Sequence, residues 1–159
     1  RPISLTCVAC KLMERIVTSS MLAHLQRHGV ISKQQHGFLS GRSTSSNLLE
    51  TLNDWTLAIN DKKSVGVIYI DYAKAFDSVC HAKLLNKLAG CDISGQLLKY
   101  VESFLHGKTQ QTRVGHTLST SVELTSGVVQ GSVLGPLLFV LFINDITDLF
   151  NNIASATVN

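Results

Sequence analysis

The sequence predicts an α+β fold in which helices outnumber strands. Apolar residues recur at intervals of three and four along much of the chain, which is typical of amphipathic helices. One short run, Val65–Ile70, is apolar almost throughout and β-branched, and it predicts a strand covered on both faces. Residues 110–125 alternate loosely and predict a hairpin that turns at Gly115–His116. The strands are not regularly interleaved with the helices, and this order indicates an α+β plan.

Two helices are expected in the first sixty residues. The first runs from about Val8 to His28 and is expected to stop at Gly29. A polar loop rich in glycine and serine follows it. Asn47 and Glu50 predict a cap at the start of the second helix. The apolar face of that helix is marked by Leu48, Leu52, Trp55 and Ile59.

Three further helices are expected after the predicted strand. The first contains Leu84, Leu85 and Leu88. The second contains Leu97, Leu98, Val101, Phe104 and Leu105. The last is expected over Leu137–Phe150, beginning just after Pro136, because proline suits the start of a helix.

The composition indicates a folded, soluble protein. The 159 residues carry a net charge of +3, and 45% hydrophobic with 16% charged residues disfavours disorder. In residues 1–50, six lysines and arginines against two glutamates give +4, which suits phosphate binding or an ordinary solvated face. No signal peptide is recognised, and the apolar run Val133–Ile143 is shorter than the ~18 residues of a membrane span. We expect an intracellular protein, nuclear or cytoplasmic, and both chain ends suggest a segment of a longer polypeptide.

The four cysteines lack the spacing of a structural zinc site. Cys7 and Cys10 form a CxxC, but Cys80 and Cys91 are eleven residues apart. Buried free thiols in a helix are therefore the favoured interpretation of Cys7 and Cys10.

Asp71 is the first candidate for chemistry, because it ends the predicted strand Val65–Ile70. A carboxylate at the end of a buried strand lies where ligands commonly dock, and it requires a cation or a hydrogen-bond donor. One interpretation is an aspartate that caps a helix or pairs with a nearby base. The other is a ligand of Mg²⁺, which prefers carboxylate oxygens together with substrate phosphates.

Two glycine-containing stretches are further candidates. In His36–Thr44, two glycines permit close approach to a ligand, and the guanidinium of Arg42 can bind phosphate. In Ser126–Ile146, Gln130 and Gly131 precede an apolar helix and could contact a sugar or base. Each stretch alone also fits an ordinary loop.

Taken together, four motifs resemble the reverse transcriptases of non-LTR retrotransposons, the LINE-type and jockey-like elements. The motifs are RPISL, QHGFLSGRST, IYIDYAKAFDSV and QGSVLGPLLFVLFINDI, in this order along nearly the whole chain. The resemblance implies part of a right-hand polymerase, with helices packed on a small antiparallel sheet. Residues 1–60 would be fingers-like and residues 61–159 palm-like.

The resemblance also implies roles for particular residues. Asp71 would be the catalytic aspartate and metal ligand, and Phe76 the aromatic ring that crowds a ribose 2′-hydroxyl. Nucleotide-binding roles fall to Arg1, Phe76, Gln130 and Gly131. Arg42 would contact the template. Asp77 is instead expected to cap the following helix.

The implied reaction adds dNTPs to a DNA primer on an RNA template, with two Mg²⁺ ions in the intact enzyme. No membrane partner is expected. The family's adjacent aspartate pair does not occur in these 159 residues. We therefore expect the isolated chain to be inactive. The alternative is a catalytically inactive remnant that at most binds nucleic acid, and a relative among the intron-encoded maturases is a third possibility.

Overall fold

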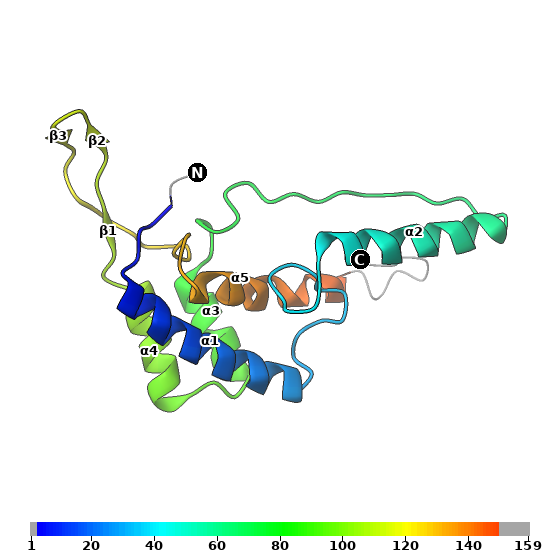
Figure 1. Cartoon of the computed structure of the whole chain (residues 1–159), viewed down its shortest axis with the longest axis horizontal. Coiled ribbons are helices and arrows are strands. Elements are labelled where there is room, and N and C mark those ends of the chain that lie inside the picture. The colour runs from blue at the N-terminus through cyan, green and yellow to red at the C-terminus, as the bar shows by residue number, and fades with distance from the viewer. Residues whose placement is uncertain (1–2, 150–159) are drawn as a thin grey trace.

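The computed structural model describes residues 3–149. In chain order the helices are α1 (Val8–Arg27), α2 (Thr44–Asn60), α3 (His81–Gly90), α4 (Gly95–Leu105) and α5 (Leu134–Ile143), followed by the 3₁₀ helix η1 (Asn144–Leu149). The strands are β1 (Thr109–Gln110), β2 (Arg113–Val114), β3 (Thr117–Leu118) and β4 (Val122–Glu123). This mixture of helices with a small antiparallel sheet confirms the coarse α+β prediction (Figure 1).

The strands form one long hairpin between α4 and α5. β1 pairs with β4 and β2 pairs with β3, both antiparallel. The inner pair turns at Gly115–His116, as expected, and Gly115 has a φ of 60° that suits a tight hairpin turn.

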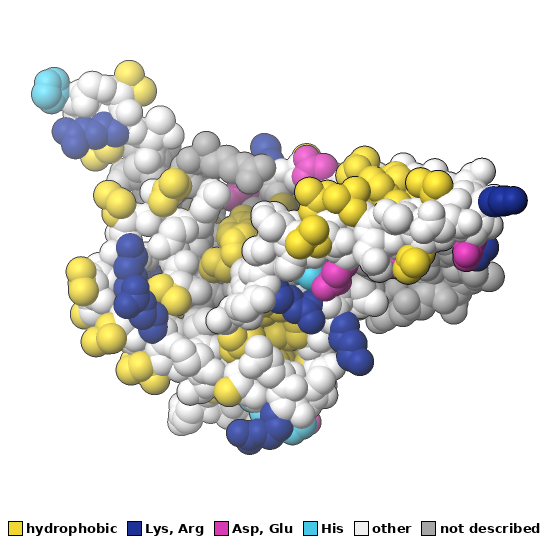
Figure 2. All heavy atoms as spheres, turned by 45° about the vertical axis from the view of Figure 1, so that its right-hand side comes forward, with side chains coloured by type: hydrophobic (Ala, Val, Ile, Leu, Met, Phe, Trp, Pro, Cys, Tyr) yellow, Lys and Arg dark blue, Asp and Glu magenta, His cyan; other side chains and the backbone are white. Residues whose placement is uncertain are grey.

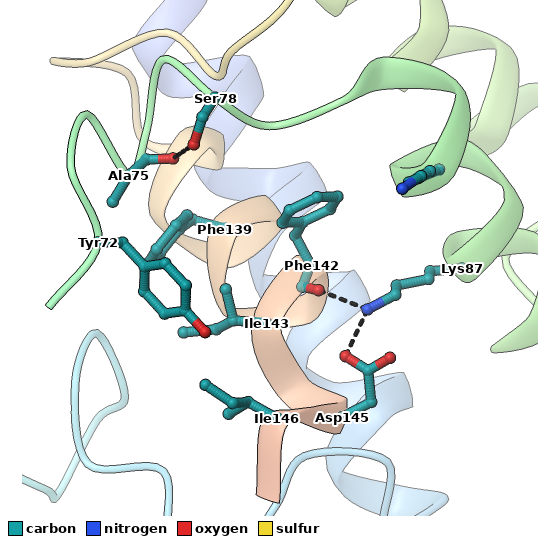
Figure 3. Close-up of a pocket in the computed structure, with 10 residues that line it drawn as sticks. Tyr72, Ala75, Ser78, Lys87, Phe139, Phe142, Ile143, Asp145 and Ile146 are labelled. Carbon is teal, nitrogen blue, oxygen red and sulfur yellow. Dashed lines mark hydrogen bonds and ion pairs between the residues drawn. The ribbon is translucent and has the colours of Figure 1, made fainter. Parts of the chain in front are cut away.

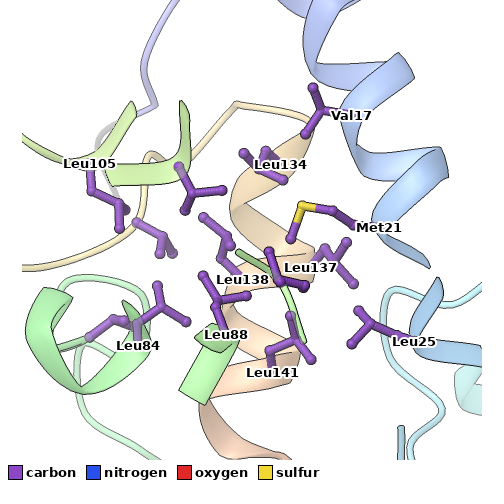
Figure 4. Packing of buried hydrophobic residues seen from close by; sticks show 14 residues of the cluster. Val17, Met21, Leu25, Leu84, Leu88, Leu105, Leu134, Leu137, Leu138 and Leu141 are labelled. Carbon is purple, nitrogen blue, oxygen red and sulfur yellow. The ribbon is translucent and has the colours of Figure 1, made fainter. Parts of the chain in front are cut away.

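The core lies where α5 meets α1 and α3, with α4 packed on α3. α5 is apolar on nearly every side, which fits a helix surrounded by protein. Its leucines interdigitate with Met21 and Leu25 of α1 and with Leu84 and Leu88 of α3 (Figure 4). The 3.6-residue spacing therefore predicted α1, α3 and α4 correctly.

The start of α5 differs from the prediction. The helix begins at Leu134, so Pro136 lies inside the first turn, where a missing N–H breaks no helical hydrogen bond. The amides of Val133 and Leu134 donate to one carboxylate oxygen of Glu14, at 2.6 and 3.0 Å. Ser132 Oγ accepts from Gly135 N–H. Glu14 comes from α1 and is only 2% exposed, so a buried side chain from far along the chain caps α5.

The prediction of a strand over Val65–Ile70 is wrong. The segment is an extended run without strand pairing, and Ile68 and Tyr69 are 87% and 85% exposed. A strand is stable only when a neighbour pairs with its backbone groups, and none of the described strands lies beside it.

α2 projects away from the core and packs on no other helix or strand among the described residues (Figure 1). None of its residues is buried. Figure 2 shows hydrophobic side chains gathered over this projecting part of the molecule. The exposed hydrophobic residues of α2 include Leu48, Leu49, Leu57 and Ile59.

Three predictions about helix ends and cysteines also need correction. α2 begins four residues earlier than Asn47 would place it, because Ser43 and Ser46 form a reciprocal capping box. Asp77 does not cap α3, whose N-cap is Cys80 without a side-chain cap bond. Cys7 and Cys10 are free but exposed, since Cys7 is the N-cap of α1. None of the described helices has the length and hydrophobicity needed to cross a membrane.

Glu14→Ala should lower the free energy of unfolding by about 1–3 kcal/mol, because two buried amides lose their acceptor. Glu14→Gln keeps an acceptor oxygen and should lose less. Urea unfolding of the chain measures both. The exposed Glu102→Ala on α4 is the control and should stay within about 0.5 kcal/mol of the unsubstituted chain. Equal stability of the Glu14→Ala and Glu102→Ala variants would contradict the capping role.

Candidate active site

The turn that follows Asp71 is bound to the loop before α5 by a row of hydrogen bonds, here called the seam. Gly127 N–H donates to Val79 O at 2.8 Å, and Val128 N–H donates to Phe76 O at 2.9 Å. Ser126 Oγ–H donates to Asp77 O at 2.9 Å. The seam therefore joins two of the sequence motifs, AFDSV and SGVVQG, although neither forms a strand there.

Glycine is required at position 127 of the seam. Its φ is +94°, and a Cβ there would lie 3.0 Å from both Cα and O of Asp77. Such contacts would force the two segments apart, so the short hydrogen bonds depend on the missing side chain.

His81 supports the seam from α3. Its ring is buried, and Nε2–H donates to Gly127 O at 2.7 Å, since a carbonyl can only accept. The ring of His106 meets it edge-on, with centroids 5.1 Å apart. Sequence analysis missed His81, because its partner lies 46 residues away and no local pattern marks it.

Phe76 is half-buried and packs between two other rings. Its centroid lies 4.8 Å from that of Phe139 in α5 and 5.9 Å from that of Phe38. Phe38 belongs to the HGFLSGR loop, so three of the sequence motifs meet at this ring. The backbone bond from Val128 N–H fixes the turn that carries the ring.

Gln130 and Gly131 form a turn that the N-terminal segment crosses. Ser4 N–H donates to Gln130 O at 2.8 Å. Gly131 has a φ of +100°, and a Cβ there would lie 2.6 Å from Ser4 O. The turn is thus occupied on one side by residues 3–4 of the chain. Arg1, expected to bind nucleotide, lies outside the described residues.

Asp71 lies in the exposed extended segment. Within residues 3–149 its carboxylate makes no hydrogen bond or ion pair, so the capped or paired alternative has no partner there. The described residues also contain no group of three side chains that could hold a metal ion.

A cavity of about 370 Å³ hollows the surface between the turn that follows Asp71 and α5, and Tyr72 is one of the residues that line it. Figure 3 shows Tyr72 on one side of it and the ion pair of Lys87 and Asp145 on the other, with Phe139 and Phe142 between them. Lys87 Nζ lies 2.5 Å from Asp145 Oδ1. This hydrogen bond lowers the pKa of Asp145 below its ordinary value. Asp145 is exposed, with the ammonium group of Lys87 beside it.

Arg42 helps to hold its own loop together. Its Nη1 donates to Lys33 O and, at 3.0 Å, to Gln35 O. Nearby, the buried His36 bonds Ser46 Oγ and Glu50 Oε2 of α2, at 3.1 and 3.2 Å. These contacts fix the HGFLSGR loop on α2, and part of the Arg42 guanidinium is already bound to protein.

Comparison with known proteins identifies the family. The sequence model of the family described as reverse transcriptase (RNA-dependent DNA polymerase) matches residues 1–158. The RNA-directed DNA polymerase from mobile element jockey of Drosophila melanogaster is 34% identical over 145 residues, which are 91% of this chain. The probable RNA-directed DNA polymerase from transposon X-element of the same species is 30% identical over 145 residues.

A more distant relative is the Pol polyprotein from type-1 retrotransposable element R2 of Popillia japonica, 28% identical over 140 residues, or 87% of this chain. The chain spans 16% of the jockey and X-element proteins and 19% of the R2 protein. The family match covers residues 1–158 and therefore contains all four sequence motifs. In the structure these motifs are joined by the seam, by the ring contacts of Phe76 and by the contact of residues 3–4 with the turn at Gln130 and Gly131. The chain therefore belongs to the reverse transcriptase (RNA-dependent DNA polymerase) family.

Proposed function

We propose that this chain is the fingers-palm part of a retrotransposon RNA-directed DNA polymerase. In the whole protein it would help to add dNTPs to a DNA primer on an RNA template. The observation that carries the proposal is the meeting of the motifs: the family match covers residues 1–158, and the seam joins AFDSV to SGVVQG. Residues 1–60 would act as fingers and residues 61–159 as palm, with one shared core because α1 packs on α5.

Asp71 is the proposed catalytic residue and metal ligand. Its carboxylate fits Mg²⁺ because it is exposed and has no protein partner among the described residues. A bound Mg²⁺ would neutralise charge on the phosphates of the incoming nucleotide. One carboxylate is a small part of such a site, since Mg²⁺ also binds water and phosphate oxygens.

The other proposed residues bind and orient the nucleic acid and the nucleotide. Phe76 would crowd a ribose 2′-hydroxyl, and its two neighbouring rings keep it in place. Gln130 and Gly131 would line the nucleotide site through the backbone and a side-chain amide. Arg1 would meet the triphosphate, and the remaining donors of Arg42 would meet the template. Binding should weaken with salt, since phosphate contacts release counterions.

The second candidate function is nucleic-acid binding without catalysis, as in an inactive remnant. The observation in its favour is that the described residues offer no group of three metal-binding side chains around Asp71. The two candidates differ in whether a complete polymerase needs the Asp71 carboxylate.

Asp71→Asn should reduce Mg²⁺-dependent primer extension by about 10³-fold, because the substitution removes the negative charge that attracts the metal. The assay uses a chimera in which this chain replaces the matching region of the Drosophila melanogaster jockey polymerase. Asp61→Asn is the matched control, since the exposed Asp61 carboxylate pairs at the surface with Lys63. An inactive parent chimera would favour the remnant, and an active Asp71→Asn chimera would refute the ligand role.

Phe76→Val should lower the preference of the same chimera for dNTPs over rNTPs by about tenfold or more, because a smaller side chain leaves room for the 2′-hydroxyl. Competing incorporation of the two sugars on an RNA template measures the preference. Phe104→Leu is the control, because it removes a ring of α4 that makes no ring contact with Phe76 among the described residues, so it should leave sugar choice unchanged. Equal sugar choice in the parent and Phe76→Val chimeras would count against the gate.

A further inference from the structure

The CxxC at the start of α1 places two thiols side by side. Cys7 is the N-cap, and its Sγ accepts a hydrogen bond from Cys10 N–H at 3.3 Å, while its own Sγ–H donates to Cys10 Sγ at 3.1 Å. Both residues are exposed and free. The nucleic-acid chemistry proposed above uses neither of them.

The two sulfurs are close to the geometry of a disulfide. An S–S bond is about 2.05 Å long, so closing the 3.1 Å separation requires a movement of about 1 Å. A metal centre is a weaker interpretation, because the described residues place no third ligand beside the pair.

The environment also distinguishes the two thiols. Hydrogen bonding with the Cys10 side chain, and with its backbone amide, lowers the pKa of Cys7, and a lower pKa yields more of the reactive thiolate at neutral pH. The same contact raises the pKa of Cys10, with a further increase from Glu14 and an opposing effect of Lys108. Among the described residues, Tyr100 of α4 also interacts electrostatically with Cys10. Cys7 is therefore suited to attack first and Cys10 to resolve.

We propose that Cys7 and Cys10 form a reversible redox site that exchanges with low-molecular-weight disulfides. The Cys7 thiolate attacks one sulfur of the small disulfide, forms a mixed disulfide and releases one thiolate. Cys10 then loses its proton to solvent and attacks Cys7 Sγ, which closes the Cys7–Cys10 disulfide and releases the second thiolate. Two protein thiols are oxidised, and one small disulfide is reduced to two thiols.

The site is close in sequence to a functional contact. Ser4, three residues before Cys7, donates its N–H to Gln130 O in the turn before α5. A change in the oxidation state of Cys7 and Cys10 would therefore occur three residues from the Ser4–Gln130 hydrogen bond.

Cys80 provides a matched control within the same chain. It is also an exposed helix N-cap, but it has no side-chain cap bond and no thiol beside it among the described contacts. Cys7→Ser is expected to fold, because serine is a preferred N-cap residue.

The test treats the 159-residue chain with oxidised glutathione, blocks remaining thiols by alkylation and maps peptides by mass spectrometry. Trypsin leaves both cysteines in one N-terminal peptide that ends at Lys11. We expect the mass of that peptide to fall by two hydrogens and the peptide to carry no alkyl group, because both thiols are in the disulfide. Reduction with dithiothreitol should restore both thiols. In Cys10→Ser the reaction should stop with one glutathione on Cys7. In Cys7→Ser the adduct on Cys10 should form no faster than that on Cys80.

Two results would overturn the proposal. One is a wild-type N-terminal peptide that remains reduced while Cys80 reacts. The other is glutathione retained on Cys7 of the wild-type chain as persistently as in Cys10→Ser. Neither result depends on polymerase activity, so the redox site and the proposed function can fail separately.

Discussion

The fold around the candidate site depends on the close passage of two backbones at Gly127. The seam brings residues 76–79 against residues 126–128 without a sheet, and its hydrogen bonds of 2.8–2.9 Å are possible because position 127 has no side chain. His81 adds a bond to the carbonyl of the same glycine. The position of Phe76, and the ring contacts it makes, therefore follow from a backbone constraint.

A second long-range contact fixes α5 relative to α1. The buried carboxylate of Glu14 accepts from the first amides of α5, so a shift of one helix against the other that kept these groups out of water would leave them unpaired. The turn at Gln130 and Gly131 lies just before this cap and also receives Ser4. Two N-terminal residues, Ser4 and Glu14, thus contact the turn before α5 and the start of α5, far along the chain, where the reverse transcriptase motifs meet.

The sequence pattern predicted the helices and the hairpin turn, which are determined by interactions between residues close together in the chain. The spacing of leucines gave α1, α3 and α4, and Gly115–His116 gave the hairpin turn. The prediction of a strand over Val65–Ile70 was wrong because a strand needs a partner from elsewhere in the chain, and the described strands provide none. Glu14 and His81 were missed because their partners lie 119 and 46 residues away. Among the candidate site residues, Phe76, Gln130 and Gly131 lie in the converging region, whereas Asp71 stands apart on the exposed segment, and its role stays a prediction.

Amide hydrogen exchange of the 159-residue chain tests the seam most directly. The amides of Gly127 and Val128 donate to Val79 and Phe76, so they should exchange much more slowly than the amides of Ile68 and Tyr69 in the exposed segment. Exchange at residues 127 and 128 as fast as at residues 68 and 69 would show that the two motifs are not joined, and would contradict this account of the site.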